Sequence, residues 1–209
     1  MVVSESSPLE ASPEERGAYS RAKLQAEALV RAAVAEKRLD AVILRPGHIW
    51  TEQRPLLLPA VGMRAGCLLL MLGDPNLFLP LVHVDDVVSA LLLAREADVA
   101  PGTVFHLVDD DPIAREELAR LYRAAREPDL RIVQVPIRVA TMTAGLLGGV
   151  TRALGRPLGP SPHRLRAGVV SLRFDCTRAF QELGWRPAVK SRTALLALLD
   201  RRAGPGRIT

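Results

Sequence analysis

The chain has 209 residues, of which 48% are hydrophobic and 24% are charged, and its formal net charge is +5. This composition is typical of a soluble globular protein with one large domain or two small ones. The positive charge comes from scattered arginines, and aromatic residues make up only 4% of the chain. Since no basic cluster contains interleaved aromatics, we expect no nucleic-acid partner.

Cysteine and histidine positions give no sign of a disulfide framework or a metal site. Cys67 and Cys176 are far apart in the sequence, and the four histidines are isolated. Neither pattern has the spacing of metal ligands, and two separate cysteines are compatible with a reducing compartment. The first ten residues are polar and have no basic region of the kind that opens a secretory signal. We therefore expect a cytoplasmic protein without a metal ion.

The two longest uncharged apolar runs are residues 55–63 and 139–151. Both are shorter than the roughly 20 residues that a membrane-spanning helix requires. No span is predicted. The second run leaves peripheral contact with a membrane open as an alternative, but packing in the core is the favoured interpretation.

Helices and strands alternate along the predicted chain. Ser12, Pro13 and Glu15 occupy the positions of an N-cap, a first helical residue and a capping partner, which predicts a helix to about Arg38. Residues 79–96 read as a strand or extended entry into a helix. Further strands are expected at 40–46, 102–109 and 130–136, and further helices at 111–127, 137–155, 175–185 and 191–202. A long connection rich in Leu and Pro is expected after residue 46. The alternation predicts an α/β fold.

The stretch GAYSRAKLQAE, residues 17–27, places Tyr19 and Lys23 four residues apart on the first predicted helix. Residues at this spacing share a helix face. An ammonium close to a phenol favours the ionised phenol, so such a pair can transfer a proton near neutral pH. The ammonium can also donate hydrogen bonds to the hydroxyls of a ligand. The alternative is an ordinary helix in which Tyr19 is half-buried and Lys23 pairs with Glu27.

Four motifs occur in a characteristic order: YSRAK at 19–23, ILRPGHIW at 43–50, PLVHVDDVVSALLLA at 80–94 and FDCTRAFQELGWRP at 174–187. With them the chain resembles the extended short-chain dehydrogenase/reductase superfamily, the NAD-dependent epimerase/dehydratase group. The resemblance implies the C-terminal part of a Rossmann-like, doubly wound parallel sheet. Residues 1–108 would be the remnant of the dinucleotide-binding domain with the catalytic helix. Residues 109–209 would form a smaller, mostly helical substrate-binding region.

The resemblance also implies roles for particular residues. Tyr19 would be the general acid/base, and Lys23 would assist it and hold the nicotinamide ribose of NAD or NADP. The loop beside the nicotinamide would be Pro46, Gly47, His48 and Ile49, with a plain loop role left open for His48. His83 and Asp86 are expected to be structural residues that bond the start of a helix. The helix that carries Tyr19 would form a homodimer interface.

Two departures from nucleotide-sugar members favour a branch similar to 3β-hydroxysteroid dehydrogenases, which act on alcohols or ketones of less polar molecules. The loop RPGHIWTEQ lacks an Asn, and the NLFLPLVHV segment lacks an Arg-Asp pair. A nucleotide sugar needs cations for its diphosphate. Arg54, Arg64 and Arg138 could supply them, so a nucleotide-sugar epimerase or dehydratase stays open as the alternative.

The chain shows no glycine-rich phosphate turn and no residue to read the adenosine ribose. The glycines of GLLGG, residues 145–149, are interpreted as helix packing. The upstream serine or threonine that assists the tyrosine is not recognisable, and no role is assigned to Ser4, Ser6 or Ser7. A fragment or truncated gene model is the favoured explanation, ahead of an inactive remnant or one half of a two-chain protein. A truncated, non-catalytic interaction module that cannot bind a dinucleotide is the competing hypothesis.

Overall fold

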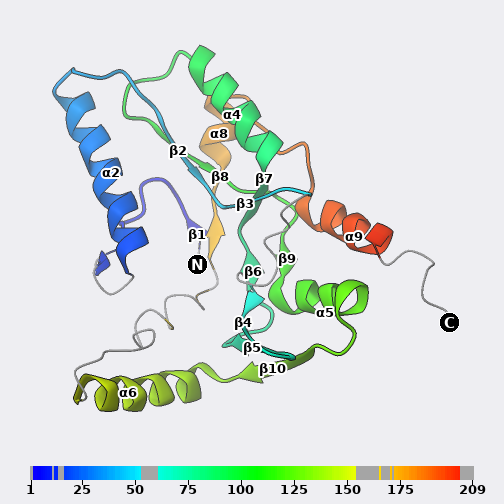
Figure 1. Cartoon of the computed structure of the whole chain (residues 1–209). Coiled ribbons are helices and arrows are strands. Elements are labelled where there is room, and N and C mark those ends of the chain that lie inside the picture. Colours follow the sequence, from blue (N-terminus) through cyan, green and yellow to red (C-terminus); the bar gives the residue numbers. More distant parts are fainter. Residues whose placement is uncertain are drawn as a thin grey trace.

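The computed structural model describes residues 2–10, 12–13, 17–52, 61–153, 165, 170 and 172–202, without the side chains of 147–153 and 200–202. Helices flank short strands, most of which pair in parallel (Figure 1). The predicted α/β class is confirmed. Among the described residues, no helix is both long and apolar enough to cross a membrane.

The helices are α2 (Ala18–Ala35), α4 (Val84–Glu96), α5 (Arg115–Arg126), α6 (Ile137–Ala153), α8 (Thr177–Glu182) and α9 (Ser191–Arg202). The strands are β1 (Val2–Val3), β2 (Ile43–Pro46), β3 (His48–Trp50), β4 (Met63–Ala65), β5 (Leu68–Leu72), β6 (Phe78–Leu79), β7 (Leu81–His83), β8 (Val104–Leu107), β9 (Ile113–Ala114), β10 (Arg131–Val135) and β11 (Arg173–Phe174).

The chain changes its sheet partner at Gly47. Strand β2 pairs in parallel with β8, whereas β3, one residue later, pairs in parallel with β7. The Gly47 N–H donates to the Leu107 carbonyl at 2.9 Å, and the His48 N–H donates to the Pro80 carbonyl at 2.7 Å. A Cβ atom on residue 47 would lie 2.3 Å from the Pro80 oxygen, so the crossing requires glycine.

The long connection predicted after residue 46 contains strands as well. Strands β4 and β5 form an antiparallel hairpin across Gly66, whose φ is +59°. Strand β10 then pairs in parallel with β5 and completes a three-stranded sheet. Burial alternates along β5: Leu69 and Met71 lie in the core, whereas Leu68, Leu70 and Leu72 are only partly buried.

Two predicted helix starts need correction. The first helix was predicted to start at Ser12 and Pro13, but α2 begins only after Gly17. Gly17 has a φ of +100°, which an α-helix does not allow. Pro13 itself is helical, and Glu15 lies outside the described residues. The helix predicted from Asp111 begins at Arg115, after the short strand β9. At its other end α2 stops at Ala35, earlier than predicted, and the N–H groups of the next three residues donate back to its carbonyls.

Helix α6 differs from its prediction in burial. Residues 139–151 were expected to pack in the core, but Val139, Met142 and Leu146 are exposed. Ala140 and Thr141 on the same helix are buried, so α6 packs through its other side.

Buried apolar side chains form two clusters. One lies between β7, β8, α4 and α8 and consists of Val82, Ala90, Phe105, Leu107, Cys176, Ala179, Leu183 and Trp185. The other joins β5, α5 and α9 and includes Trp50, Leu69, Met71, Ile113, Leu118, Leu195 and Leu199. Each cluster combines residues from both sides of position 108, and the domain boundary predicted there stays a prediction.

Candidate functional site

Tyr19 and Lys23 meet on one exposed face of α2. The Tyr19 side chain is 77% exposed, and Lys23 Nζ lies 5.9 Å from the centroid of its ring. This is the geometry of a cation–π contact. Lys23 has no ion pair with a described residue, and Glu27 pairs with Arg31 and Arg45 instead. The ordinary-helix alternative, with a half-buried tyrosine and a Lys23–Glu27 pair, is therefore wrong in both details.

An ion pair fixes α2 to strand β2. Arg45 donates to the two Glu27 carboxylate oxygens at 2.6 and 3.0 Å, and Arg31 adds a third bond at 2.9 Å. The bonds from Arg45, followed by those from Arg31, hold the pKa of the Glu27 carboxyl below its ordinary value of 4.5. Sequence analysis did not find this pair, because nothing in the spacing of residues 27 and 45 marks a contact.

The Glu27–Arg45 ion pair also determines which end of α2 lies beside which end of β2. Helix α2 and strand β2 run in opposite directions (Figure 1). Tyr19 precedes Glu27 by eight residues, or about 12 Å of helix, and Pro46 directly follows Arg45. The start of α2 and the carboxyl end of β2 therefore lie at the same end of the sheet, which is where ligands bind in open α/β folds.

Pro46 at the end of β2, and His48 and Ile49 at the start of β3, are exposed at this end of the sheet, around the partly buried Gly47. Desolvation by the surrounding protein lowers the pKa of His48, although its side chain reaches the surface. The imidazole is therefore neutral at pH 7 and can accept or donate a hydrogen bond.

His83 bonds the start of a helix as predicted, whereas Asp86 has a structural role with a different partner. His83 Nδ1 accepts a hydrogen bond from the Asp85 N–H at 3.3 Å and so caps α4. Asp86 is 2% exposed, and its two oxygens accept bonds from the N–H groups of Ala188 and Val189 at 2.8 and 3.2 Å. Asp86 thereby ties α4 to the segment between α8 and α9.

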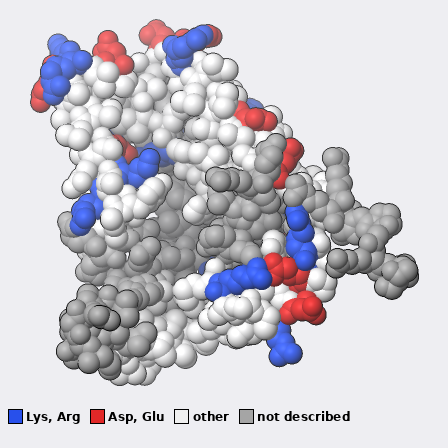
Figure 2. All heavy atoms as spheres, viewed as in Figure 1, with Lys and Arg blue, Asp and Glu red and all other residues white. Residues whose placement is uncertain are grey.

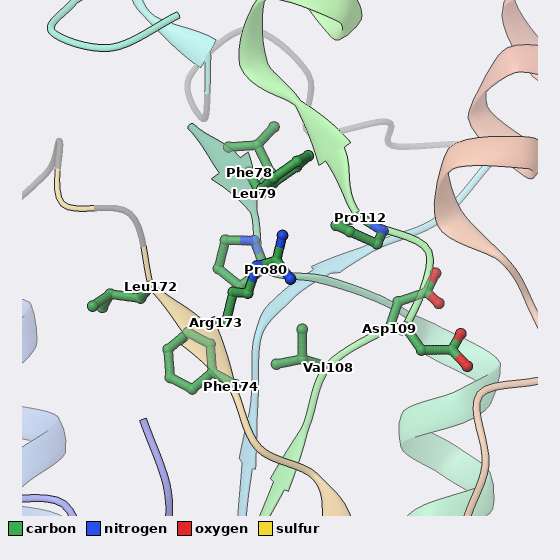
Figure 3. Close-up of a pocket in the computed structure, with 10 residues that line it drawn as sticks. Phe78, Leu79, Pro80, Val108, Asp109, Pro112, Leu172, Arg173 and Phe174 are labelled. Atoms are coloured by element: carbon green, nitrogen blue, oxygen red, sulfur yellow. The ribbon is translucent and has the colours of Figure 1, made fainter. Parts of the chain in front are cut away.

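A cavity of about 180 Å³ opens between β6, β9 and β11 (Figure 3). Its lining residues are Phe78, Leu79, Pro80, Val108, Asp109, Asp110, Pro112, Leu172, Arg173 and Phe174. Neither Tyr19 nor the loop 46–49 lines it. No signal in the sequence indicated this cavity, because it depends on the pairing of β6 with β9 and of β1 with β11.

The charged side chains that line the cavity differ in whether they have a hydrogen-bond or ion-pair partner. Asp109 accepts a bond from the N–H of Ser191, and Asp110 pairs with Lys190. Burial raises the pKa of Asp109, whereas Lys190 lowers the pKa of Asp110. The Arg173 side chain extends from β11 toward Pro80 in Figure 3, with its guanidinium 5.4 Å from the centroid of the Phe78 ring. It has no acidic partner among the described residues, so its charge is available to a ligand.

Metal ligands do not gather in the described part of the chain: no group of three His, Cys, Asp or Glu side chains there could hold an ion. Of the cations considered for a diphosphate, Arg54 lies outside the described residues and Arg64 pairs with Glu127 at 2.7 Å. Arg138 is exposed on α6.

A profile of the NAD dependent epimerase/dehydratase family matches residues 3–107. The chain belongs to this family. The match contains α2 with Tyr19 and Lys23, the ion pair of Glu27 with Arg45, and the four strands that meet at Gly47.

Curated relatives from other organisms agree with this membership. The chain is 24% identical over 203 residues to the 3beta-hydroxysteroid-dehydrogenase/decarboxylase isoform 1 of Arabidopsis thaliana, covering 90% of the chain and 46% of the relative. It is 30% identical over 186 residues to the human short-chain dehydrogenase/reductase family 42E member 1, covering 80% of the chain and 47% of the relative. The chain thus spans about half the length of the curated relatives it matches.

Solved structures share the fold. The crystal structure of gox2253 superposes with a TM-score of 0.70 at 23% identity, covering 98% of this chain and 62% of that one. DesIV, a dTDP-glucose 4,6-dehydratase from Streptomyces venezuelae solved with NAD and TYD bound, gives a TM-score of 0.62 at 19% identity, covering 96% and 54%. These likenesses identify the fold as Rossmann-like.

Proposed function

We propose that the whole protein is an NAD(P)-dependent oxidoreductase of the extended short-chain dehydrogenase/reductase type. One observation carries this proposal: the exposed phenol of Tyr19 lies beside the ammonium of Lys23, which has no ion pair among the described residues, at the carboxyl end of the sheet. Relatives named as dehydrogenases support it.

In the proposed reaction, bound NAD(P) supplies the hydride acceptor in oxidation and the hydride donor in reduction. For oxidation, the Tyr19 oxygen in its ionised form accepts the proton of the substrate hydroxyl as the carbinol carbon loses its hydride. The carbon becomes a carbonyl carbon, and the proton stays on Tyr19 until water removes it. Reduction runs through the same positions in reverse.

The residues present fit the nicotinamide half of a dinucleotide. Lys23 has no carboxylate partner among the described residues, so its N–H groups are free to donate to the ribose hydroxyls. Pro46, His48 and Ile49 form an exposed edge at the same end of the sheet, with Gly47 between them. These residues carry no information about a 2′-phosphate, and either NAD or NADP is compatible with them.

A less polar alcohol or ketone is the proposed substrate class. The cavity beside β11 has seven apolar residues, two aspartates and one arginine among its lining residues, which suits a largely apolar molecule with a polar group. The relative from Arabidopsis thaliana is named for a hydroxysteroid. The second candidate is a nucleotide-sugar epimerase or dehydratase, favoured by the free guanidinium of Arg173 and by structural neighbours such as MoeE5, solved with UDP-glucose and NAD.

The proposal extends to assembly and location. Helix α2 has no buried residue, and its alanines would allow a second copy to pack closely, so we include a homodimer through the helix that carries Tyr19 and Lys23. Residues 1–108 would be the remnant of the dinucleotide-binding domain with the catalytic helix, and residues 109–209 the substrate-binding region. We also propose that the protein is cytoplasmic and makes peripheral contact with a membrane.

The test replaces Tyr19 with Phe in the full-length protein, with Tyr122→Phe as the matched control. Tyr122 lies on α5 and donates its hydroxyl to Glu127 at 2.9 Å, away from the proposed site. We expect Tyr19→Phe to lower turnover by about 10²–10⁴-fold while calorimetry shows unchanged NAD(P) binding, because general acid–base catalysis contributes that much. The control keeps its turnover. Full activity in Tyr19→Phe would refute the proposal, and failure of the wild-type protein to bind NAD(P) would favour the non-catalytic module.

A further inference from the structure

Two ionisable side chains, Glu5 and His106, are buried next to each other. On the face shown in Figure 2, acidic and basic side chains lie next to one another at the surface, where water solvates them. By contrast, the His106 side chain on β8 is 3% exposed, and the Glu5 side chain in the N-terminal segment is 9% exposed. Burial of such groups costs free energy unless each is hydrogen-bonded or paired. Neither residue takes part in the proposed reaction.

Glu5 binds the backbone of His106 but not its ring. The His106 N–H donates to Glu5 Oε1 at 3.0 Å. The ring nitrogen Nδ1 lies 4.0 Å from the same oxygen, which is longer than a hydrogen bond. Among the described residues, this Nδ1 is the one buried side-chain nitrogen or oxygen atom without a hydrogen-bond partner. The ring is therefore buried beside a carboxylate that it does not contact.

Charged groups from three segments face the His106 ring. Glu5 lies in the N-terminal segment, Arg45 is the register partner of His106 on β2, and Asp175 directly follows β11. Burial is the main influence and lowers the pKa of His106 below its ordinary value of 6.5, and Arg45 lowers it further. Glu5 and Asp175 oppose this shift but do not reverse it. The imidazole is therefore neutral at pH 7, and adding a proton costs more in the folded protein than in water.

Few bonds attach the segment that covers His106. Strand β1 has two residues and forms a two-stranded sheet with β11. The Asp175 N–H adds a bond to the Val3 carbonyl at 2.8 Å, and Glu5 adds the bond to β8. Short, partly exposed elements open at a lower free energy than core strands do. Release of residues 2–7 is thus the least costly way to bring water to His106.

We propose that Glu5 and His106 form an acid-sensitive latch. At pH 7 the neutral imidazole stays buried, and Glu5 holds residues 2–7 against β8. As the pH falls, Nδ1 takes up a proton from water, and the charged ring favours the state in which the segment is detached. Release uncovers Phe174, whose ring meets the imidazole edge to face at 5.3 Å and lines the cavity in Figure 3. The latch therefore alters one wall of the cavity.

The sign of the effect follows from proton linkage. The pKa of His106 is lower in the closed state than its ordinary value of 6.5, so the open state holds more protons between the two values. The stability of the latch is complete above pH 6.5 and is lost as the pH falls through the closed-state pKa. The inference does not depend on the proposed catalytic activity, because opening is measured without turnover.

Hydrogen exchange of the full chain, followed by NMR between pH 7.5 and pH 5.5, tests the latch. The two amides to follow are those of His106 and Asp175, whose bonds hold the segment. After correction for intrinsic exchange rates, their protection should fall about fivefold or more, since one bound proton changes an opening equilibrium by up to about tenfold per pH unit. The amide of Ala188, which donates to Asp86 outside the segment, should keep its protection, and this excludes global unfolding.

His106→Leu removes the titrating ring but keeps the backbone N–H that Glu5 binds, so protection should no longer depend on pH. His48→Leu is the matched control. Burial also lowers the pKa of His48, but this residue lies on β3 outside the latch, so the variant should behave as the wild-type protein does. Circular dichroism establishes that both variants are folded.

A titration of the wild-type ring needs no variant: the His106 ring signals should titrate with a midpoint below pH 6.5. The proposal is overturned by a midpoint at or above this value. It is also overturned if protection of the two amides stays constant, if it falls equally in folded His106→Leu, or if it rises as the ring gains its proton. The last result would mean that Glu5 pairs with the charged ring and tightens the segment.

Discussion

Glu27 on α2 and Arg45 on β2 form a bidentate ion pair that joins the helix of the proposed acid/base to the strand of the proposed nicotinamide loop. Their side chains are only 14% and 20% exposed, so water competes weakly for these bonds. Since Tyr19 and Pro46 belong to the two elements that this pair connects, the geometry of the candidate site depends on it.

Glu27→Gln should destabilise the protein by about 1.5–3 kcal/mol, because the charge-assisted bonds weaken and a half-buried guanidinium loses its counter-charge. Glu36→Gln is the control: Glu36 also pairs with an arginine, Arg38, but the two side chains are 58% and 64% exposed. It should change stability by less than about 0.5 kcal/mol. Urea unfolding measures both values, and an equal loss in the two variants would contradict the importance of the buried pair.

The same ion pair predicts how stability depends on pH. The pKa of Glu27 is lower in the folded protein than its ordinary value of 4.5, so the folded state holds fewer protons between the two values. The contribution of Glu27 is therefore complete above pH 4.5 and is lost as the pH falls through the folded-state pKa. We expect the difference in unfolding free energy between the wild-type protein and Glu27→Gln to shrink over this range. A difference that stays constant from pH 7 to pH 3 would exclude this linkage.

Gly47→Ala should cost about 1–3 kcal/mol or more, because its Cβ would overlap a backbone carbonyl, that of Pro80, which cannot rotate away. Gly145→Ala provides the opposite control. Gly145 lies within α6 and a Cβ there meets nothing within 4 Å. It should stabilise the protein by roughly 0.5–1 kcal/mol, since alanine loses less entropy in a helix than glycine does. Thermal unfolding of both variants distinguishes a crowded position from an open one.

Alkylation should separate the two free cysteines. Cys67 is exposed, whereas burial raises the pKa of the Cys176 thiol to about 11. At pH 8 roughly one Cys176 thiol in a thousand is ionised, and the thiolate is the reactive form. Iodoacetamide should add one group to the native protein, at Cys67, and two in urea, as measured by mass spectrometry. If the native Cys67→Ser variant is labelled, Cys176 is accessible and the prediction is wrong.

Sequence reasoning found the elements whose signals are local. Strand β8 was predicted from its apolar run, and all four of its residues are buried. The pair of Tyr19 and Lys23 was found because their contact follows from helix geometry alone. Strand β7 was expected as a strand or extended entry before its helix, but the other strands of two or three residues were missed, since no periodicity develops over so short a length. Strand β1 is recognisable only through β11, at the other end of the chain.

Contacts between remote segments explain the remaining errors. Asp111 was expected to start a helix at its own position, but its carboxylate accepts bonds from the N–H and hydroxyl of Thr193, 82 residues later, at 3.1 Å. Asp109 binds the N–H of Ser191 in the same way. Both aspartates therefore cap α9, and the sequence around them gives no indication of this partner. Arg173 likewise lies at the cavity only because segments remote in the sequence contact one another.

The crossing at Gly47 has a consequence for how this protein can vary in length. Most loops tolerate an inserted residue, because their ends are held independently of what lies between them. Here a single residue, Gly47, separates strand β2, which is in register with β8, from strand β3, which is in register with β7. An insertion or deletion at this point would turn His48 and Ile49 to the opposite faces of the sheet. A library of length variants should thus accept changes at the β4–β5 turn and reject them between Pro46 and His48.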